Sequence, residues 1–257
     1  MPAEAWTLGL GAVAAAMVGF SKTGVPGTGI LVIPLMAALF GGRLSVGATL
    51  PLLILGDVLA VALYRQHAQW ARLRTLAPWL LLGLLLGSGL LKLLGDLRLK
   101  ADPLSPMIGV LVLVMLALNL LRGRLGQRLV PHSREGTVVT GALAGFTTMV
   151  SNAAGPIMSI FLNSSGLPKD QLMGTTAWTF LLLNLAKVPF LALLTADNPQ
   201  EPLYTLATLR FDLLMVPLVL AGAWAGRALQ RRLPEQAFSG ALLSLAAVSA
   251  VLLIVRH

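Results

Sequence analysis

The chain has 257 residues, of which 56% are hydrophobic and only 11% are charged, and its formal net charge is +9. A soluble domain carries about a quarter charged residues, so this composition excludes a water-soluble fold and indicates that apolar surface faces lipid. The chain has no cysteine, which excludes disulfides and thiolate chemistry. No Cys/His pattern of a metal site is present, and we expect neither a metal ion nor a cofactor. The basic residues lie mostly in short loops between apolar runs, as they do in membrane proteins, so we expect no nucleic-acid partner.

Apolar stretches long enough to cross about 30 Å of hydrocarbon recur along the whole sequence. They are continuous runs of Leu, Ala, Val and Gly without alternation, which favours helices over a membrane β-barrel. The first ten residues lack a basic start, so we expect no cleavable signal peptide. Two apolar segments, 5–40 and 137–162, are interrupted by Gly, Pro, Ser and Asn. Uninterrupted helical spans are predicted over residues 45–64, 76–94, 104–121, 172–194, 211–230 and 237–255.

The second half of the sequence repeats the first. Gly19-Phe20-Ser21 aligns with Gly145-Phe146-Thr147 at an offset of 126 residues. The stretch 46–64 aligns with 173–191, which pairs Asp57 with Asn184. Further along, Pro78, Gly83, Gly87 and Gly109 align with Pro217, Gly222, Gly226 and Gly240. We therefore predict two transmembrane repeats, 1–125 and 136–257, with a connector at 122–135.

The charges of equivalent loops predict that the second repeat is inverted. Loop 65–74 carries three arginines and no acid, whereas its counterpart 195–210 carries two acids and one arginine. Cytoplasmic loops are enriched in Lys and Arg, so we place 65–74, the connector, 163–170 and 227–235 in the cytoplasm. The predicted fold is an all-α, polytopic membrane protein with an inverted-topology repeat.

Each interrupted segment is expected to form a broken, re-entrant helical hairpin. Segment 137–162 has to leave the cytoplasm and return to it, and its 26 residues are too few for two full crossings. By symmetry, segment 5–40 dips from the outside. Each half then has one hairpin and three transmembrane helices. In the alternative topology, each interrupted segment crosses the membrane twice with short helices. The tips then stay at the same residues, but the positions of the two chain termini change.

The interruptions carry the most specific chemistry of the sequence. The first tip, 21–29, has three glycines and one proline, which exclude an ordinary helix interior. Irregular backbone at membrane depth is buried in protein or lines a cavity, and free amides at a helix start attract anions. The second tip, 147–156, repeats this chemistry without the lysine. The tips either form a polar site between the halves, as in secondary transporters, or merely kink packed helices. The candidate binding residues are Ser21, Lys22, Thr23, Gly24, Gly27, Thr28, Gly29, Ser151, Asn152, Ala153, Gly155 and Trp178.

Three ionisable residues, Lys22, Asp57 and Lys187, lie inside apolar segments, where such residues are costly and usually functional. We expect Lys22 to contact an anion. Lys187 is a second contact, a partner of Asp57, or a lysine that reaches the interface. Asp57 is a counter-ion for a lysine or a proton-coupling carboxylate. Asn184 forms a helix–helix hydrogen bond or binds the ligand, and Trp178 packs in the core or lines the pocket.

The stretches "GFSKTGVPGTGILVIPLMAALF", "LPLLILGDVLAVALYRQHAQW" and "NAAGPIMSIFLNSSGLP…GTTAWTFLLLNLAKVP" resemble the TauE/SafE family of sulfite exporters, also described as toluene sulfonate uptake permeases. The resemblance implies a plasma-membrane carrier for sulfite, sulfonates such as sulfoacetate, or thiosulfate. It places the family's two signature stretches at 19–29 and 145–156.

Two alternatives to such a carrier stay open. An anion channel with the same fold would use the same tips, and a related carrier would transport organic anions without sulfur. An enzyme is not expected, since Walker A, nucleophile-elbow and His-Glu-x-x-His motifs are absent from the sequence. The expected partners are the lipid bilayer, a small anionic substrate and, as an open question, further copies of the chain.

Overall fold

The computed structural model describes residues 5–24, 28–97, 101–125, 133–163, 167–229 and 235–255. Within these ranges the regular structure is entirely helical, as the composition predicts. Gly27, one of the candidate binding residues, lies outside the described residues.

A helix or helix series lies at each of the six predicted spans. The first is the series α3 (Gly42–Ala48), α4 (Leu50–Tyr64) and η2 (Arg65–His67). The others are α5 (Trp70–Asp96), α6 (Leu104–Leu125), α9 (Lys169–Asp197), α10 (Leu206–Leu229) and α11 (Glu235–Val255). Most begin before the predicted start, because a helix continues into the polar boundary where hydropathy has already fallen. In the described chain, five of these segments, all except α11, are long and apolar enough to cross a membrane. The protein is therefore a multi-pass membrane protein.

The two interrupted segments form shorter helices. The first contains α1 (Ala5–Thr23), η1 (Thr28–Leu31) and α2 (Val32–Phe40), and the second contains α7 (Arg134–Ser151) and α8 (Gly155–Asn163). Helix α7 ends because Asn152 adopts a left-handed conformation, with a φ of 59°. Asparagine tolerates this conformation better than most residues. The amide of Asn152 still donates to the carbonyl of Thr148, at 3.0 Å.

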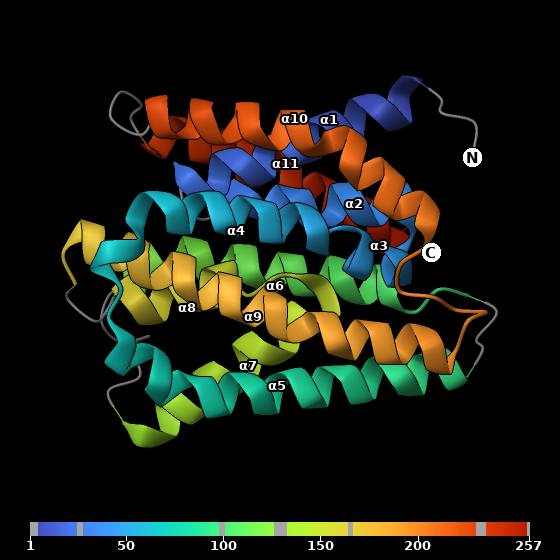
Figure 1. Ribbon diagram of the computed structural model, residues 1–257, viewed down its shortest axis with the longest axis horizontal. Helices are drawn as coiled ribbons and strands as arrows, with labels where there is room; N and C mark the ends of the chain where they lie inside the picture. Colours follow the sequence, from blue (N-terminus) through green and yellow to red (C-terminus); the bar gives the residue numbers. More distant parts are fainter. Residues whose placement is uncertain are drawn as a thin grey trace.

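Helices from opposite halves of the sequence pair at the two edges of the molecule. Figure 1 shows α1 beside α10 at one edge and α5 beside α7 at the other, with α4 and α9 between them. Glycines permit both contacts. A Cβ at Gly83 would lie 2.1 Å from the carbonyl oxygen of Ala142, and one at Gly145 would lie 2.1 Å from that of Leu80. Backbones therefore touch directly between α5 and α7, as small residues allow in membrane helices.

The pair α1–α10 makes the same contacts at the repeat-equivalent positions. A Cβ at Gly222 would lie 2.0 Å from the carbonyl oxygen of Ala16, and one at Gly19 would lie 2.0 Å from that of Val219. The offset that aligns Gly19 with Gly145 also aligns Ala16 with Ala142, and the offset that aligns Gly83 with Gly222 aligns Leu80 with Val219. One set of backbone contacts therefore occurs twice.

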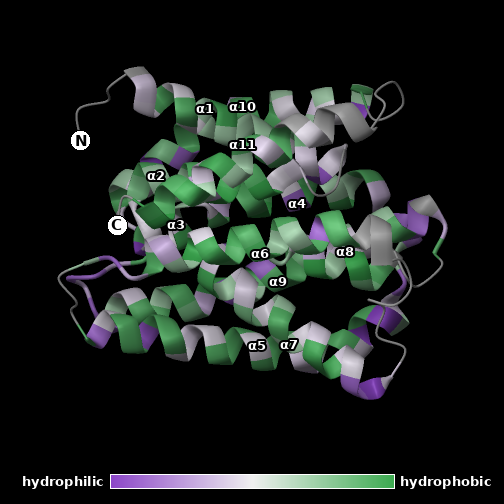
Figure 2. Cartoon of the chain, turned by 180° about the vertical axis from the view of Figure 1, so that it is seen from behind, coloured by the Kyte–Doolittle hydropathy of each residue, from purple (hydrophilic) through white to green (hydrophobic). Residues whose placement is uncertain are grey.

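Polar residues gather at the two ends of the helices, whereas the middle of the molecule is predominantly apolar (Figure 2). Large apolar side chains also face outward along the helices, as on α10, where Leu213 is 73% exposed and Trp224 is 76% exposed. Such exposure is unfavourable in water but matches a lipid environment. The few charged groups in the interior therefore stand out as the place to look for a site.

Candidate functional site

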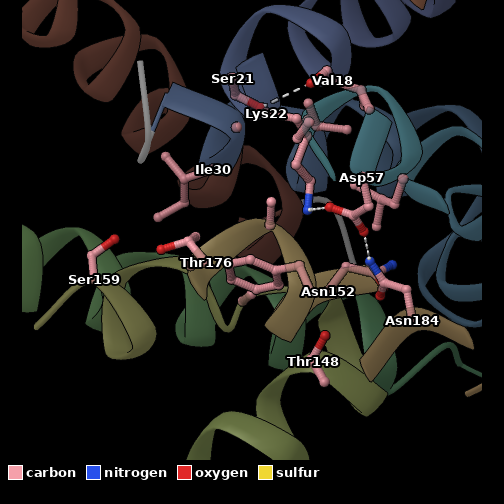
Figure 3. Close-up of a pocket in the computed structure, with 18 of the residues that line it drawn as sticks. Val18, Ser21, Lys22, Ile30, Asp57, Thr148, Asn152, Ser159, Thr176 and Asn184 are labelled. Carbon is pink, nitrogen blue, oxygen red and sulfur yellow. Dashed lines mark hydrogen bonds and ion pairs between the residues drawn. The ribbon is translucent and has the colours of Figure 1, made fainter. Parts of the chain in front are cut away.

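An ion pair between a partly buried lysine and a fully buried aspartate joins the first tip to the middle of α4. Lys22, in the last turn of α1, places its Nζ atom 2.7 Å from Oδ1 of Asp57. Asp57 is fully buried, and its Oδ2 atom accepts a hydrogen bond of 2.6 Å from Nδ2 of Asn184 on α9. Figure 3 shows the three side chains converging on one point. The ammonium of Lys22 also lies 4.3 Å from the ring centroid of Phe180, a cation–π geometry.

A cavity of about 100 Å³ lies beside this ion pair. One water molecule needs roughly 10–15 Å³ on this measure, so the cavity has room for a small polyatomic ion. Its walls come from both halves of the sequence. The polar residues that line it are Ser21, Lys22, Asp57, Thr148, Asn152, Ser159, Thr176 and Asn184.

The second tip brings a second lysine close to the cavity. The left-handed turn at Asn152 exposes its side chain to the cavity. The Oδ1 atom of Asn152 accepts a hydrogen bond from Nζ of Lys187, and its Nδ2 atom donates to the carbonyl of Val46 at 3.2 Å. Lys187 itself is 0% exposed. It therefore does not reach the membrane interface, and the described ion pair of Asp57 is made with Lys22 instead.

Eight of the predicted site residues meet at the cavity. From the first half these are Ser21, Lys22, Gly29 and Asp57, and from the second half Asn152, Ala153, Gly155 and Asn184. Gly29 has a local reason to be glycine, since a Cβ there would lie 2.7 Å from Oγ of Ser21. Asn184 makes the helix–helix hydrogen bond that was one of its two predicted roles, and it lines the cavity as well.

Six other candidates lie outside the cavity lining, and one of them, Lys187, is connected to it through Asn152. The hydroxyl of Thr23 donates to the carbonyl of Ala223 on α10 at 2.7 Å, and Gly24 packs against the backbone of Gly226 on the same helix. Buried Thr28 likewise does not line the cavity. Ser151 donates a hydrogen bond to the carbonyl of Thr147 within α7, and Trp178 on α9 packs against Trp70 on α5 with ring centroids 5.1 Å apart.

Sequence reasoning missed part of the lining. It missed Met173, Thr176 and Phe180, which precede the predicted Asn184 at spacings of three or four along α9 and line the cavity with it. Counting back in helical steps from Asn184 would have identified this stripe. Asp212 is the second residue of the predicted span 211–230, which would leave it near the end of that span. In the structure it is the seventh residue of α10 and is buried, and neither carboxylate oxygen has a hydrogen-bond partner in the described chain.

The fold and the site together define a class: a multi-pass helical membrane protein whose interior holds a small cavity with charged groups. The family model for the sulfite exporter TauE/SafE matches residues 10–253. The chain therefore belongs to the TauE/SafE family of membrane transporters, which confirms the resemblance noted in the sequence. Comparisons with curated proteins and with solved structures gave no match.

Proposed function

We propose that the protein is a secondary carrier for a small sulfur-containing anion: sulfite, a sulfonate such as sulfoacetate, or thiosulfate. Family membership supports transport of a sulfur anion. The observation that carries the proposed binding site is the cavity between the two tips, into which Lys22 points from one half and Asn152 from the other. The Lys22 side chain is partly buried, and an ammonium group shielded from bulk water attracts an anion more strongly than one in water. Lysine within a membrane segment also commonly marks a substrate path.

The proposed carrier has an inverted repeat. The repeat-equivalent backbone contacts of α1–α10 and α5–α7 support this arrangement. The hydrogen bond between Asp57 and Asn184 supports it too, because these residues are aligned in the repeat and residues near a two-fold axis meet their own equivalents. In inverted-repeat transporters the substrate site lies between the halves, and the halves move against each other to alternate access.

Re-entrant hairpins are part of the same proposal. Helices α2 and α8 have nine residues each, which corresponds to about 14 Å against about 30 Å of hydrocarbon. Neither helix alone is long enough to cross. Segments of this length fit the returning arms of hairpins that carry the two tips into the membrane interior.

We place the carrier in the plasma membrane, with the basic loops in the cytoplasm. The only partners that the proposed function needs are the bilayer and the anion, and association into a homo-oligomer remains a prediction. Catalysis plays no part in the proposal.

Counterflow in proteoliposomes tests the carrier proposal. Vesicles loaded with unlabelled sulfite or sulfonate should accumulate the labelled anion transiently, because a carrier exchanges substrate whereas an open channel does not. Lys22→Met should reduce this exchange at least tenfold, since it removes the ammonium that faces the cavity. Lys92→Gln is the matched control, because Lys92 is exposed and pairs with Asp96 and Asp197 away from the site. Flux without counterflow would favour the channel, and normal exchange by Lys22→Met would remove Lys22 from the site.

A further inference from the structure

We infer that Asp57 sets the charge of the cargo, and that the site is matched to a singly charged anion such as a simple alkanesulfonate, in preference to sulfoacetate or thiosulfate, which carry two charges near neutral pH. The site holds one fully buried lysine, Lys187, one partly buried lysine, Lys22, and one fully buried aspartate, Asp57. Pairing of Lys22 with Asp57 leaves one positive charge, that of Lys187, for the cargo to neutralise. The inference rests on the proposed function and specifies its substrate class.

The charge count includes the helices packed around the cavity. Lys22 comes from α1, Asp57 from α4 and Lys187 from α9, and the other described charged residues on these three helices lie at helix ends. Neither Lys187 nor Asp212, which lies on the α10 helix packed against α1 and α4, lines the cavity itself. Lys187 is counted because it bonds to the lining residue Asn152, whereas neither carboxylate oxygen of Asp212 has a hydrogen-bond partner among the described residues. The cavity therefore has two ammonium groups and one carboxylate in its immediate surroundings.

Lys187 lacks the partner that a buried ammonium normally has. Its ammonium donates a hydrogen bond to the neutral amide oxygen of Asn152, and no carboxylate of the described residues lies within ion-pair distance of it. A buried charge is costly unless it is paired. An anion beside Asn152 would supply the missing negative charge. The first turn of α8 lines the same part of the cavity through Gly155 and Pro156, and the positive end of a helix dipole favours an anion there as well.

Asp57 opposes a doubly charged anion at the same place. After one negative charge has neutralised Lys187, a second one would face the carboxylate of Asp57, which is fully buried and cannot be screened by water. The amide of Asn184 and the ammonium of Lys22 hold that carboxylate in position. Replacing Asp57 by asparagine removes the opposing charge and leaves two ammonium groups without a counter-ion. The variant site is therefore matched to a dianion.

The test compares methanesulfonate with sulfate, which both present oxygens on tetrahedral sulfur. Their charges of one and two are constant around neutral pH. Binding is measured calorimetrically to the purified full-length protein in lipid nanodiscs. The wild type should prefer methanesulfonate, and Asp57→Asn should shift the affinity ratio toward sulfate at least tenfold. Lys187→Gln, which keeps a hydrogen-bond donor, should weaken methanesulfonate binding at least tenfold.

The double variant Asp57→Asn/Lys187→Gln makes the test specific to charge. It leaves Lys22 as the single charge, so methanesulfonate binding should return to within a few-fold of wild type, which structural damage from two substitutions would not produce. Lys92→Gln should leave the affinity ratio unchanged. The inference is overturned if Asp57→Asn keeps the wild-type affinity ratio of methanesulfonate to sulfate. It is also overturned if Lys187→Gln binds methanesulfonate as tightly as the wild type does, and this second result can be obtained even if Asp57→Asn does not fold. A wild-type protein that binds and transports no anion at all would instead refute the proposed function.

Discussion

Replacing Gly83 by alanine perturbs the backbone contact that holds α5 against α7. The added Cβ would lie 2.1 Å from the carbonyl oxygen of Ala142 and 2.6 Å from the amide nitrogen of Phe146. Both are backbone atoms, so no side-chain rotation relieves the clash and the helices have to separate. Overpacking of this kind costs about 1–3 kcal/mol. Because both clashing atoms are backbone, the cost should lie near the upper end of that range. Alanine regains about 1 kcal/mol through its higher helix propensity, so the expected net loss is about 2 kcal/mol.

Gly89→Ala on the same helix is the matched control, because a Cβ there would meet no atom within 4 Å. It should leave stability unchanged or raise it slightly. Thermal unfolding of the purified protein in detergent measures both variants, and Gly83→Ala should lower the melting temperature by several degrees at about 2–4 °C per kcal/mol. Gly222→Ala should behave like Gly83→Ala, since it meets the carbonyl of Ala16 at 2.0 Å. Equal melting temperatures for Gly83→Ala and Gly89→Ala would refute the proposed close packing of α5 on α7.

Two further predictions concern the second tip and the loop before α6. Asn152→Ala should lower the melting temperature more than Asn152→Gly does. Both variants lose the contact with Lys187, but only alanine is destabilised, by about 1 kcal/mol, in the left-handed conformation. Equal decreases in melting temperature would show that the backbone conformation at this position is unimportant. Burial raises the pKa of Asp102, but hydrogen bonds from the hydroxyl of Ser105 and from the amides of Gly42, Leu104 and Ser105 outweigh it and hold the pKa below its ordinary value. Its stabilising contribution should therefore be complete above the unfolded-state pKa of about 3.9 and be lost as the pH falls through the lower folded value. Melting temperatures measured against pH should show this acid loss in the wild type and a smaller loss in Asp102→Asn, and parallel curves would contradict it.

The sequence by itself determined the features that depend on local composition. Hydropathy located the helices because each span has to be apolar along its own length. The end of α7 at Asn152 could be anticipated within a residue, since the Ser-Asn and Gly-Pro pairs around it disfavour a continuous helix regardless of the surroundings. The alignment of Gly19 with Gly145 and of Gly83 with Gly222 also needed no structure, although their shared role in close packing became visible only with their partners.

Only the tertiary structure decided which polar groups meet. Lys22, Asp57 and Asn184 are distant in sequence, and their contact depends on how α1, α4 and α9 are rotated about their axes. The sequence left the partner of Asp57 open because Lys22 and Lys187 are chemically alike. In the folded structure Asp57 pairs with Lys22, and Lys187 donates to Asn152 instead. Helix packing also places Trp178 against Trp70, outside the cavity lining, and buries Asp212. Local composition fixes where a helix runs, but the rotation of each helix is fixed by the contacts of all its neighbours at once, and the site is made by that rotation.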